Sequence, residues 1–127
     1  MNILTYGLFD TEDWNQALEG KFLQLTWKGQ EYMLFAQRGV HRYHNQVLAH
    51  FAESHAIPYR WITPEQLVTE DPELLIGGGG RFRLDLDKHT LEVWDDSQAY
   101  GRFNENGLIE KLIAAGSPWD SLRVTIA

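Results

Sequence analysis

One histidine of this sequence has the local setting of a catalytic base. His44 follows Tyr43 near the start of a segment whose apolar residues recur every three or four positions, as in an amphipathic helix. The positive end of a helix dipole disfavours a protonated imidazole and keeps the ring neutral near pH 7. A neutral imidazole can accept a proton or attack an electrophile. The alternative, more common for a single histidine beside an apolar helix face, is a packing or surface role.

Two further segments could bind an anion. Gly77-Gly78-Gly79-Gly80 precede Arg81, and we expect them to form a turn whose N–H groups point at one ligand. The sequence SQAYG, from Ser97 to Gly101, follows a predicted strand and could offer a hydroxyl and backbone N–H groups to phosphate oxygens. A flexible connection and an ordinary polar loop are the alternative interpretations of these two segments.

A metal centre is a separate hypothesis. His41 and His44 are spaced i, i+3, so they could bind a metal together with Asp85 or Asp87. The sequence has no H-E-x-x-H pattern, no thiolate, and no third histidine at a spacing that points to the same site. We therefore expect no metal and no other cofactor.

The composition excludes several classes of protein. With no cysteine, the chain can form neither a disulfide framework nor a thiolate zinc site, and it cannot use a cysteine nucleophile. The net charge of −7 argues against broad binding to nucleic acid or to anionic membranes, because both are polyanions. Any anion site must then be local, which draws attention to Lys21, Arg38 and Arg81.

Length and hydropathy indicate one compact domain over residues 1–127. Hydrophobic residues make up 43% of the chain, which is enough for a core, and a charged content of 23% does not suggest disorder. The N-terminus has no basic region, and nowhere do about 18 apolar residues follow one another. We therefore expect a soluble, cytoplasmic protein. We also expect it to be a monomer.

Apolar periodicity predicts the elements that position the N-terminal residues. The expected elements are a short helix or turn over 11–18, hairpin strands over 21–27 and 32–36, a helix over 41–55 and a strand over 57–62. Pro58 places that last strand toward an edge. Thr63-Pro64-Glu65-Gln66 has the pattern of a capping box, and it predicts a further short helix that ends before Asp71.

The C-terminal half has the clearest strand signal. Residues 81–87 alternate strictly between polar and apolar side chains. The elements expected after them are a turn at 87–89, a strand over 90–94, a loop over 95–104, a helix across 108–113 and a last strand near 122–126. Strands mixed with two main helices indicate an α/β fold, specifically an α+β sandwich in which both helices pack on a mixed β-sheet.

Taken in order, three motifs resemble those of the Janus/Ocnus family of phosphohistidine phosphatases. They are Tyr43-His44, the glycines with Arg81, and the SQAYG segment. The order of glycines with arginine, strand, turn, strand, S-x-A-Y-G, helix and final strand is similar to the family through the whole C-terminal half. Toward the N-terminus, Lys21-Phe22 resembles the family's lysine-aromatic strand opening, and Arg38-Gly39 resembles its R-G pair before the Y-H helix.

The resemblance implies a fold, an activity and a site. The fold would be phosphohistidine-phosphatase-like, and the activity would be metal-independent hydrolysis of a P–N bond in a phosphorylated protein or small phosphoramidate. His44 would be the catalytic residue, as general base or as nucleophile. The implied phosphate-binding residues are Lys21, Arg38, Asn45 through its backbone N–H, Arg81, Ser97, Gln98 and Ala99.

Two features depart from the family's pattern. Extra residues over 62–71 could alter the rim where a protein substrate docks, and Asp95-Asp96 place carboxylates where the family tends to have uncharged residues. These carboxylates could repel a phosphoryl group or demand a different substrate. They motivate the alternative of a non-catalytic phosphate- or phosphopeptide-binding module, in which the same cations bind without turnover.

Overall fold

A mixed six-stranded sheet forms the centre of the protein. The computed structural model describes residues 1–9 and 17–127, and the strand order is β1-β3-β2-β6-β7-β8. The strands are β1 (Asn2–Tyr6), β2 (Leu18–Trp27), β3 (Gln30–Gln37), β6 (Leu74–Asp85), β7 (Thr90–Trp94) and β8 (Arg123–Ile126). The four inner strands pair antiparallel, whereas β1 and β8 run parallel to their neighbours.

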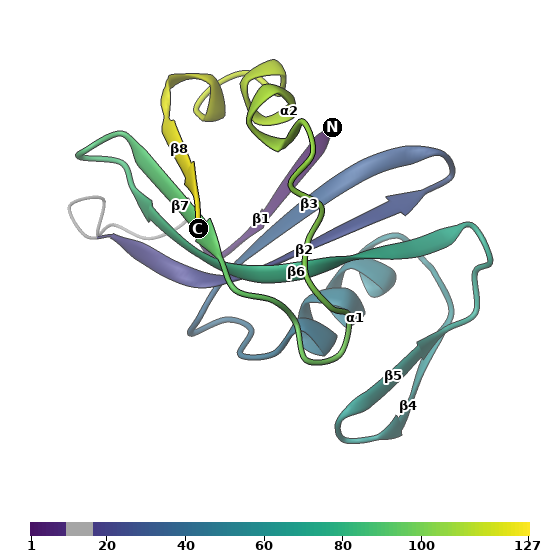
Figure 1. Ribbon diagram of the computed structural model, residues 1–127. Coiled ribbons are helices and arrows are strands. Elements are labelled where there is room, and N and C mark those ends of the chain that lie inside the picture. Colours follow the sequence, from purple (N-terminus) through teal and green to yellow (C-terminus); the bar gives the residue numbers. More distant parts are fainter. Residues whose placement is uncertain (10–16) are drawn as a thin grey trace.

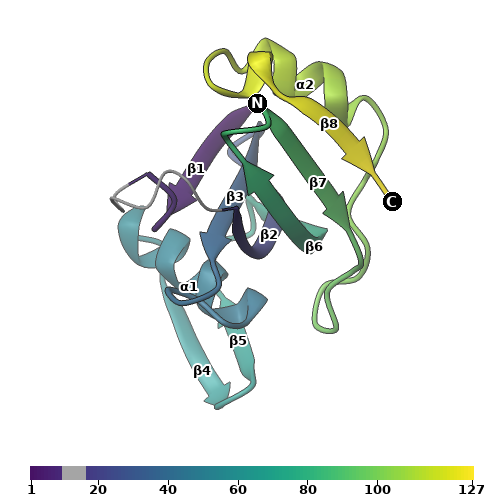
Figure 2. The same cartoon turned by 90° about the vertical axis from the view of Figure 1, so that its left-hand side faces the viewer.

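Two helices cover opposite faces of this sheet. The helix α1 (His44–Ser54) packs on one face, and α2 (Leu108–Ala114) with the short 3-10 helix η1 (Trp119–Ser121) packs on the other. Figure 1 shows the sheet between the two helices, and Figure 2 shows the same arrangement from the side. The predicted mixed sheet with two main helices is therefore confirmed. Over the described residues, no helix is long and apolar enough to cross a membrane.

The strands divide the core into two layers because successive side chains point to opposite faces. In β2, Phe22 packs in the layer under α2, whereas Leu23 packs in the layer under α1. Phe51 of α1 is fully buried in the second layer. Both faces of β2 and β3 are thus covered, which fixes the register of the central strands, since a slip of one residue would exchange the two layers.

Helix α1 begins later than the predicted 41–55 range. Its N-cap is Tyr43, whose backbone is extended, and the side-chain oxygen of Gln46 accepts the N–H groups of Arg42 at 2.8 Å and Tyr43 at 3.2 Å. These hydrogen bonds from the first turn to the residues before it fix the direction in which the backbone enters the helix. His44 is therefore the first helical residue.

The predicted short helix after Thr63 is wrong. That segment is part of a separate hairpin, β4 (Tyr59–Thr63) and β5 (Gln66–Thr69), which projects from the body of the protein (Figures 1 and 2). The Thr63 hydroxyl accepts the Glu65 N–H at 3.2 Å, so it closes a turn instead of capping a helix. Val68 and Thr69 are β-branched and favour the extended chain.

The predicted turn at Gly77–Gly80 is also wrong, because all four glycines lie inside β6. Gly79 and Gly80 pair with Leu23 and Phe22 of β2, and the pairing shifts register near Gly77. The hairpin of β2 and β3, the strand β7 and the helix α2 lie close to their predicted positions. For the short helix or turn predicted over 11–18, residues 11–16 lie outside the described residues, and Leu18 already belongs to β2.

Candidate active site

The imidazole of His44 is buried against strand β6. The residue is 4% exposed, and its Nε2 atom lies 3.0 Å from the carbonyl oxygen of Gly80. A carbonyl oxygen can only accept a hydrogen bond, so Nε2 carries the proton and donates it. In the neutral ring Nδ1 is then the atom with the lone pair. The contact with Gly80 therefore selects one tautomer. Histidines that act as bases are commonly held in one tautomer by such a hydrogen bond to the other ring nitrogen.

The glycines of β6 make room for this ring. A Cβ atom on Gly79 would lie 2.8 Å from Cδ2 and 2.9 Å from Nε2 of His44, and 2.7 Å from the carbonyl oxygen of Phe22. On Gly80 it would lie 2.5 Å from the carbonyl oxygen of Trp94. Side chains essentially never come so close to other atoms. The glycine run is needed for close packing of a ring on a strand, and not for a turn.

Burial lowers the pKa of His44 below its usual value of 6.5. The largest cause is the loss of hydration by the charged form, and the Lys21 ammonium lowers the pKa further. The backbone carbonyls of Gly80 and Phe22 and the carboxylate of Asp95 raise the pKa and so act in the opposite direction. The neutral ring expected from the helix dipole thus has burial as its main cause.

Two of the predicted cations lie beside this ring. Lys21 and Arg81 are direct partners across β2 and β6, so their side chains share a face of the sheet. It is the α1 face, because Leu23, two residues beyond Lys21, packs against α1. The guanidinium of Arg81 also lies over the ring of Trp94, 5.5 Å from its centroid. The strand register therefore produces a local basic pair in an acidic chain.

Asp95 contacts one of these cations, which the sequence interpretation missed. Its Oδ2 lies 3.8 Å from Nη1 of Arg81, and both side chains are about half exposed. An exposed ion pair of this kind contributes only about 0–1 kcal/mol. The carboxylate therefore competes with an incoming anion for Arg81, and a stronger ligand can displace it.

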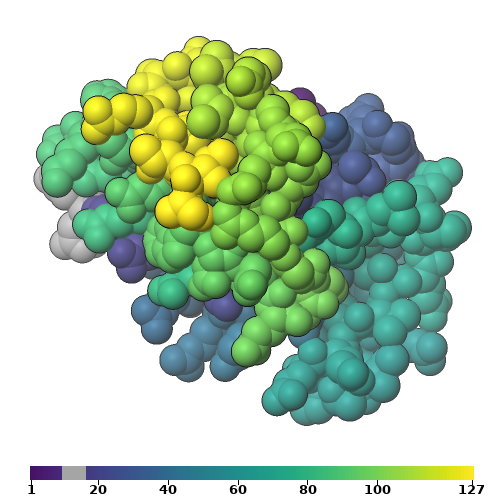
Figure 3. All heavy atoms as spheres, in the orientation of Figure 1, coloured from purple at the N-terminus to yellow at the C-terminus, as the bar shows by residue number. Residues whose placement is uncertain are grey.

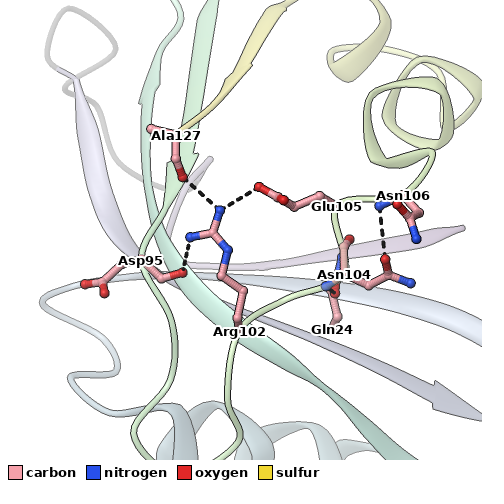
Figure 4. A network of polar contacts seen from close by, with 7 residues as sticks. All are labelled: Gln24, Asp95, Arg102, Asn104, Glu105, Asn106 and Ala127. Atoms are coloured by element: carbon pink, nitrogen blue, oxygen red, sulfur yellow. Dashed lines mark hydrogen bonds and ion pairs between the residues drawn. The ribbon is translucent and has the colours of Figure 1, made fainter.

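The loop over 95–104 is held at its two ends, as Figure 4 shows. Arg102 donates to the carbonyl oxygens of Asp95 at 3.0 Å and Ala127 at 2.8 Å, and it pairs with the carboxylate of Glu105 at 2.6 Å. The guanidinium satisfies three acceptors from three segments, so it fixes the backbone at Asp95, whose φ of 71° lies in the left-handed region.

The far end of this loop is tied to the sheet by an amide side chain. Gln24 in β2 donates to the carbonyl oxygen of Asn104 at 3.0 Å and accepts the N–H of Asn104 at 2.7 Å. Figure 4 places this pair beside the Arg102 contacts. The loop is therefore a supported element that can hold a binding group in place.

The segment Ser97–Gly101 folds back on itself beside β6. The Ser97 N–H donates to the carbonyl oxygen of Gly101 at 3.0 Å, and the Gly101 N–H donates to that of Ser97 at 2.8 Å. The carbonyl oxygen of Gly101 also accepts the N–H of Gly79 at 3.0 Å. Ser97 is buried, and its hydroxyl accepts the Tyr100 N–H at 3.2 Å. The Ser97 N–H is thus already paired within the loop, so in this conformation it does not point at an anion site.

Four other backbone N–H groups, two at the start of α1 and two in the Ser97–Gly101 segment, are not used by hydrogen bonds within their own elements. The N–H groups of Gln46 and Val47 reach the carbonyl oxygen of Tyr43, so those of His44 and Asn45 have no acceptor within the helix. In the part of the chain that the structure describes, no acceptor pairs with the N–H of Gln98 or Ala99, which lie on the exposed side of their loop.

The side chain of Asn45 joins three elements. The hydroxyl of Tyr100 donates to its Oδ1 at 2.7 Å, and its Nδ2 donates to the carbonyl oxygen of Glu65 in the turn of the β4–β5 hairpin. Burial raises the pKa of Tyr100 to about 12, so the phenol keeps its proton at neutral pH. The resemblance implies a role only for the Asn45 backbone, whereas the structure gives its side chain a structural one.

Arg38 lies in the turn after β3, and its backbone is tied to strand β2. Its N–H donates to the carbonyl oxygen of Glu19 at 2.9 Å, two residues from Lys21. The residue is exposed, and among the described residues its guanidinium has no ion-pair partner. Binding of phosphate by Arg38 stays a prediction.

His41 and His44 do not point to a common metal site. Nε2 of His41 lies 2.7 Å from Nδ1 of His50, and the ring of Tyr6 stacks on His50 with the centroids 3.9 Å apart. The ring of His44 instead faces Gly80. Within residues 1–9 and 17–127, no three His, Asp or Glu side chains gather into a group that could hold a metal.

Comparison with known proteins adds no relative to these observations. No protein-family model matches the chain, and no curated protein matches it at a significant level. The resemblance to the Janus/Ocnus family therefore depends on the sequence motifs alone.

The tight fit at Gly79 predicts a specific sensitivity. Gly79→Ala should displace the ring of His44 or the strand and lower the free energy of unfolding by about 1–3 kcal/mol, as overpacking does. Gly77→Ala is the matched control, because its Cβ would have no neighbour closer than 3.5 Å. Denaturant unfolding measures the stability, and the imidazole signals of His44 in an NMR spectrum report its environment. Equal behaviour of the two variants would contradict the close contact.

Proposed function

We propose that this chain is a metal-independent phosphatase that hydrolyses a P–N phosphoramidate bond, as in phosphohistidine, in the manner of the Janus/Ocnus family. The observation that carries the proposal is the arrangement around His44. A buried ring, held in one tautomer by Gly80 and neutral near pH 7, lies at a helix start beside Lys21 and Arg81.

The free lone pair of His44 supports two routes. In the first, Nδ1 takes a proton from water while the water oxygen bonds to phosphorus and the P–N bond of the substrate breaks. In the second, Nδ1 itself bonds to phosphorus as the substrate's P–N bond breaks, and water then cleaves the phosphoryl group from the ring. In both routes the leaving nitrogen takes up a proton, and the products are a free amine or imidazole and orthophosphate.

The surrounding groups would stabilise the phosphoryl oxygens. Phosphoryl transfer requires positioning and charge stabilisation more than covalent chemistry from the protein. Lys21 and Arg81 supply positive charge, and the N–H groups of His44 and Asn45 face outward at the positive end of α1. These groups are local, so a chain with a net charge of −7 can still bind an anion here.

The ion pair between Arg81 and Asp95 favours a second candidate function. A carboxylate close to Arg81 would oppose the charge of a bound phosphoryl group, and a binding module without turnover tolerates such competition better than an enzyme does. Titration of phosphohistidine with measurement of released orthophosphate separates the two functions. Binding without release would favour the module, and release would favour the phosphatase.

Removal of His44 provides the direct test of the catalytic role. His44→Ala should reduce the rate of orthophosphate release from phosphohistidine by about 10² to 10⁴ or more, because the base or nucleophile is lost. His41→Ala is the control, since its ring contacts His50 and not the proposed site, and it should keep the parent rate. Unfolding curves of both variants must first show that they are folded. A parent rate in folded His44→Ala would make the assignment wrong.

The pH dependence should follow the lowered pKa of His44. A protonated ring has no lone pair, so kcat/KM should stay level at neutral pH and fall only as the pH drops below 6.5, after subtraction of spontaneous hydrolysis. As the pH falls, His44 of the unfolded chain takes up its proton at a higher pH than His44 of the folded protein does. The free energy of unfolding should therefore also fall below pH 6.5, and His44→Gln should reduce that fall. A kcat/KM that rises with acidity would contradict a neutral base.

Asp95 should weaken the binding of phosphate. Asp95→Asn frees Arg81, and it should lower the KM for a phosphoramidate, or the inhibition constant of orthophosphate, by up to about fivefold, the value of an exposed ion pair. Asp96→Asn is the matched control, because it removes the same charge from the next residue, which makes no ion pair with Arg81 among the described residues. If the two variants change KM equally, the effect comes from net charge and not from the contact.

A further inference from the structure

A groove runs between α1 and the β4–β5 hairpin, outside the site described above. Its cavity volume is about 620 Å³, and it extends from Gln46 in the first turn of α1 to Glu53 and Ser54 in the last turn. Trp61 of β4 lines the same groove, as do His41 and His50. This volume is within the range that accommodates a small ligand or a few side chains, about 300–1,000 Å³.

The hairpin that borders the groove presents apolar side chains to solvent. Trp61 is 42% exposed and Ile62 is 56% exposed, and Tyr43 at the start of α1 is 57% exposed. In Figure 3 the hairpin forms a lobe that projects beside the body of the protein. The side chain of Asn45, the residue next to His44, donates to the carbonyl oxygen of Glu65 and so fastens the turn of the hairpin to the start of α1. The hairpin is thus held at the rim of the proposed phosphoryl site.

One end of the groove favours a positive charge. Among the described residues, Glu53 is the only carboxylate in the lining, and no described lysine or arginine lines the groove. Tyr59 donates to one of the Glu53 oxygens at 3.1 Å, and no described cation pairs with this carboxylate. The negative end of the helix dipole adds to this charge, because the last turn of α1 contains no basic residue. The aromatic face of Trp61 can also bind a cation.

The two ends of α1 therefore suit opposite charges at a fixed separation. Glu53 follows His44 by nine positions, which in a helix corresponds to about 14 Å along the axis and about two and a half turns. Glu53 therefore lies on the outer, groove side of α1, opposite the buried ring of His44. An extended peptide covers about 3.3–3.6 Å per residue, so about four residues span the same length. A phosphoryl group at the start of α1 and a basic side chain at Glu53 would thus belong to one short segment.

We propose that the groove recognises a lysine or arginine located about four residues from the phosphorylated residue of a protein substrate. The inference rests on the proposed function, and it assigns the substrate class as a basic phosphoprotein segment. The net charge of −7 supports this choice, because an acidic protein attracts a basic partner over a longer range than any single contact. Glu53 and Trp61 are specificity residues, and they take no part in the chemical step.

The experiment measures how fast the parent protein hydrolyses a series of phosphohistidine peptides of equal length. The peptides carry lysine four residues before or after the phosphohistidine, lysine one residue away, alanine throughout, or leucine at the fourth position. We expect the KM of one peptide with lysine at the fourth position to be about two- to fivefold lower than that of the alanine peptide, with kcat unchanged. The preference should decrease at high salt, because exposed charges are screened.

Variants identify the groups responsible. Glu53→Gln and Trp61→Ala should each reduce the preference for lysine and leave the hydrolysis of free phosphoramidate unchanged. Glu110→Gln is the matched control, since this exposed carboxylate lies on α2, on the opposite face of the sheet, and it should keep the preference. A preference that persists in Glu53→Gln, or a stronger preference for leucine than for lysine, would overturn the proposal.

Failure of the proposed function gives a different result. If the parent protein releases no orthophosphate from phosphoramidate or from any peptide, the phosphatase proposal fails. The groove is then tested by fluorescence anisotropy with labelled peptides that carry a non-hydrolysable phosphonate analogue of phosphohistidine. Tighter binding with lysine at the fourth position, lost in Glu53→Gln, supports the groove, and equal binding of all peptides overturns it.

Discussion

The close contact between the ring of His44 and the backbone of β6 is the constraint on which the site depends. The ring can approach because Gly79 has no side chain, and the carbonyl oxygen of Gly80 then accepts the proton of Nε2. The same contact buries the ring, which lowers its pKa and leaves Nδ1 with the lone pair. Tautomer, protonation state and orientation of the proposed catalytic residue thus have one physical origin.

This contact also explains which parts of the fold the sequence could predict. The strands β2, β3 and β7 and the helix α1 were found because their periodicity depends on residues within each element. The glycines 77–80 looked like a turn because glycine is locally permissive, whereas their real requirement comes from a residue far away in the chain. Thr63 was misinterpreted for a similar reason, since its hydroxyl can accept an N–H in a helix cap or in a tight turn, and only the pairing of β4 with β5 decides.

Within the candidate site, the sequence identified the residue types better than their contacts. Lys21, His44 and Arg81 come together as the motifs imply, because the register sets Lys21 opposite Arg81. The pairing of Asp95 with Arg81 follows from the register of β6 with β7, which places Trp94 opposite Arg81 and makes Asp95 the next residue. That register is not readable from a period-two pattern alone. The link from Asn45 to Tyr100 likewise requires the fold, since 55 positions separate the two residues.

The two ends of α1 lie in surroundings of opposite charge. The chain is acidic as a whole, yet the start of α1 lies near Lys21 and Arg81, and its last turn carries Glu53 and no basic residue. A helix of 11 residues therefore separates a positive end from a negative end by a fixed length, and its dipole has the same sense as these side chains. A ligand with one anionic and one cationic group is stabilised at both ends only if its own spacing matches the helix. If the proposed function holds, the length of α1 would thus determine which spacing of the two charges in a substrate segment fits both ends of the helix.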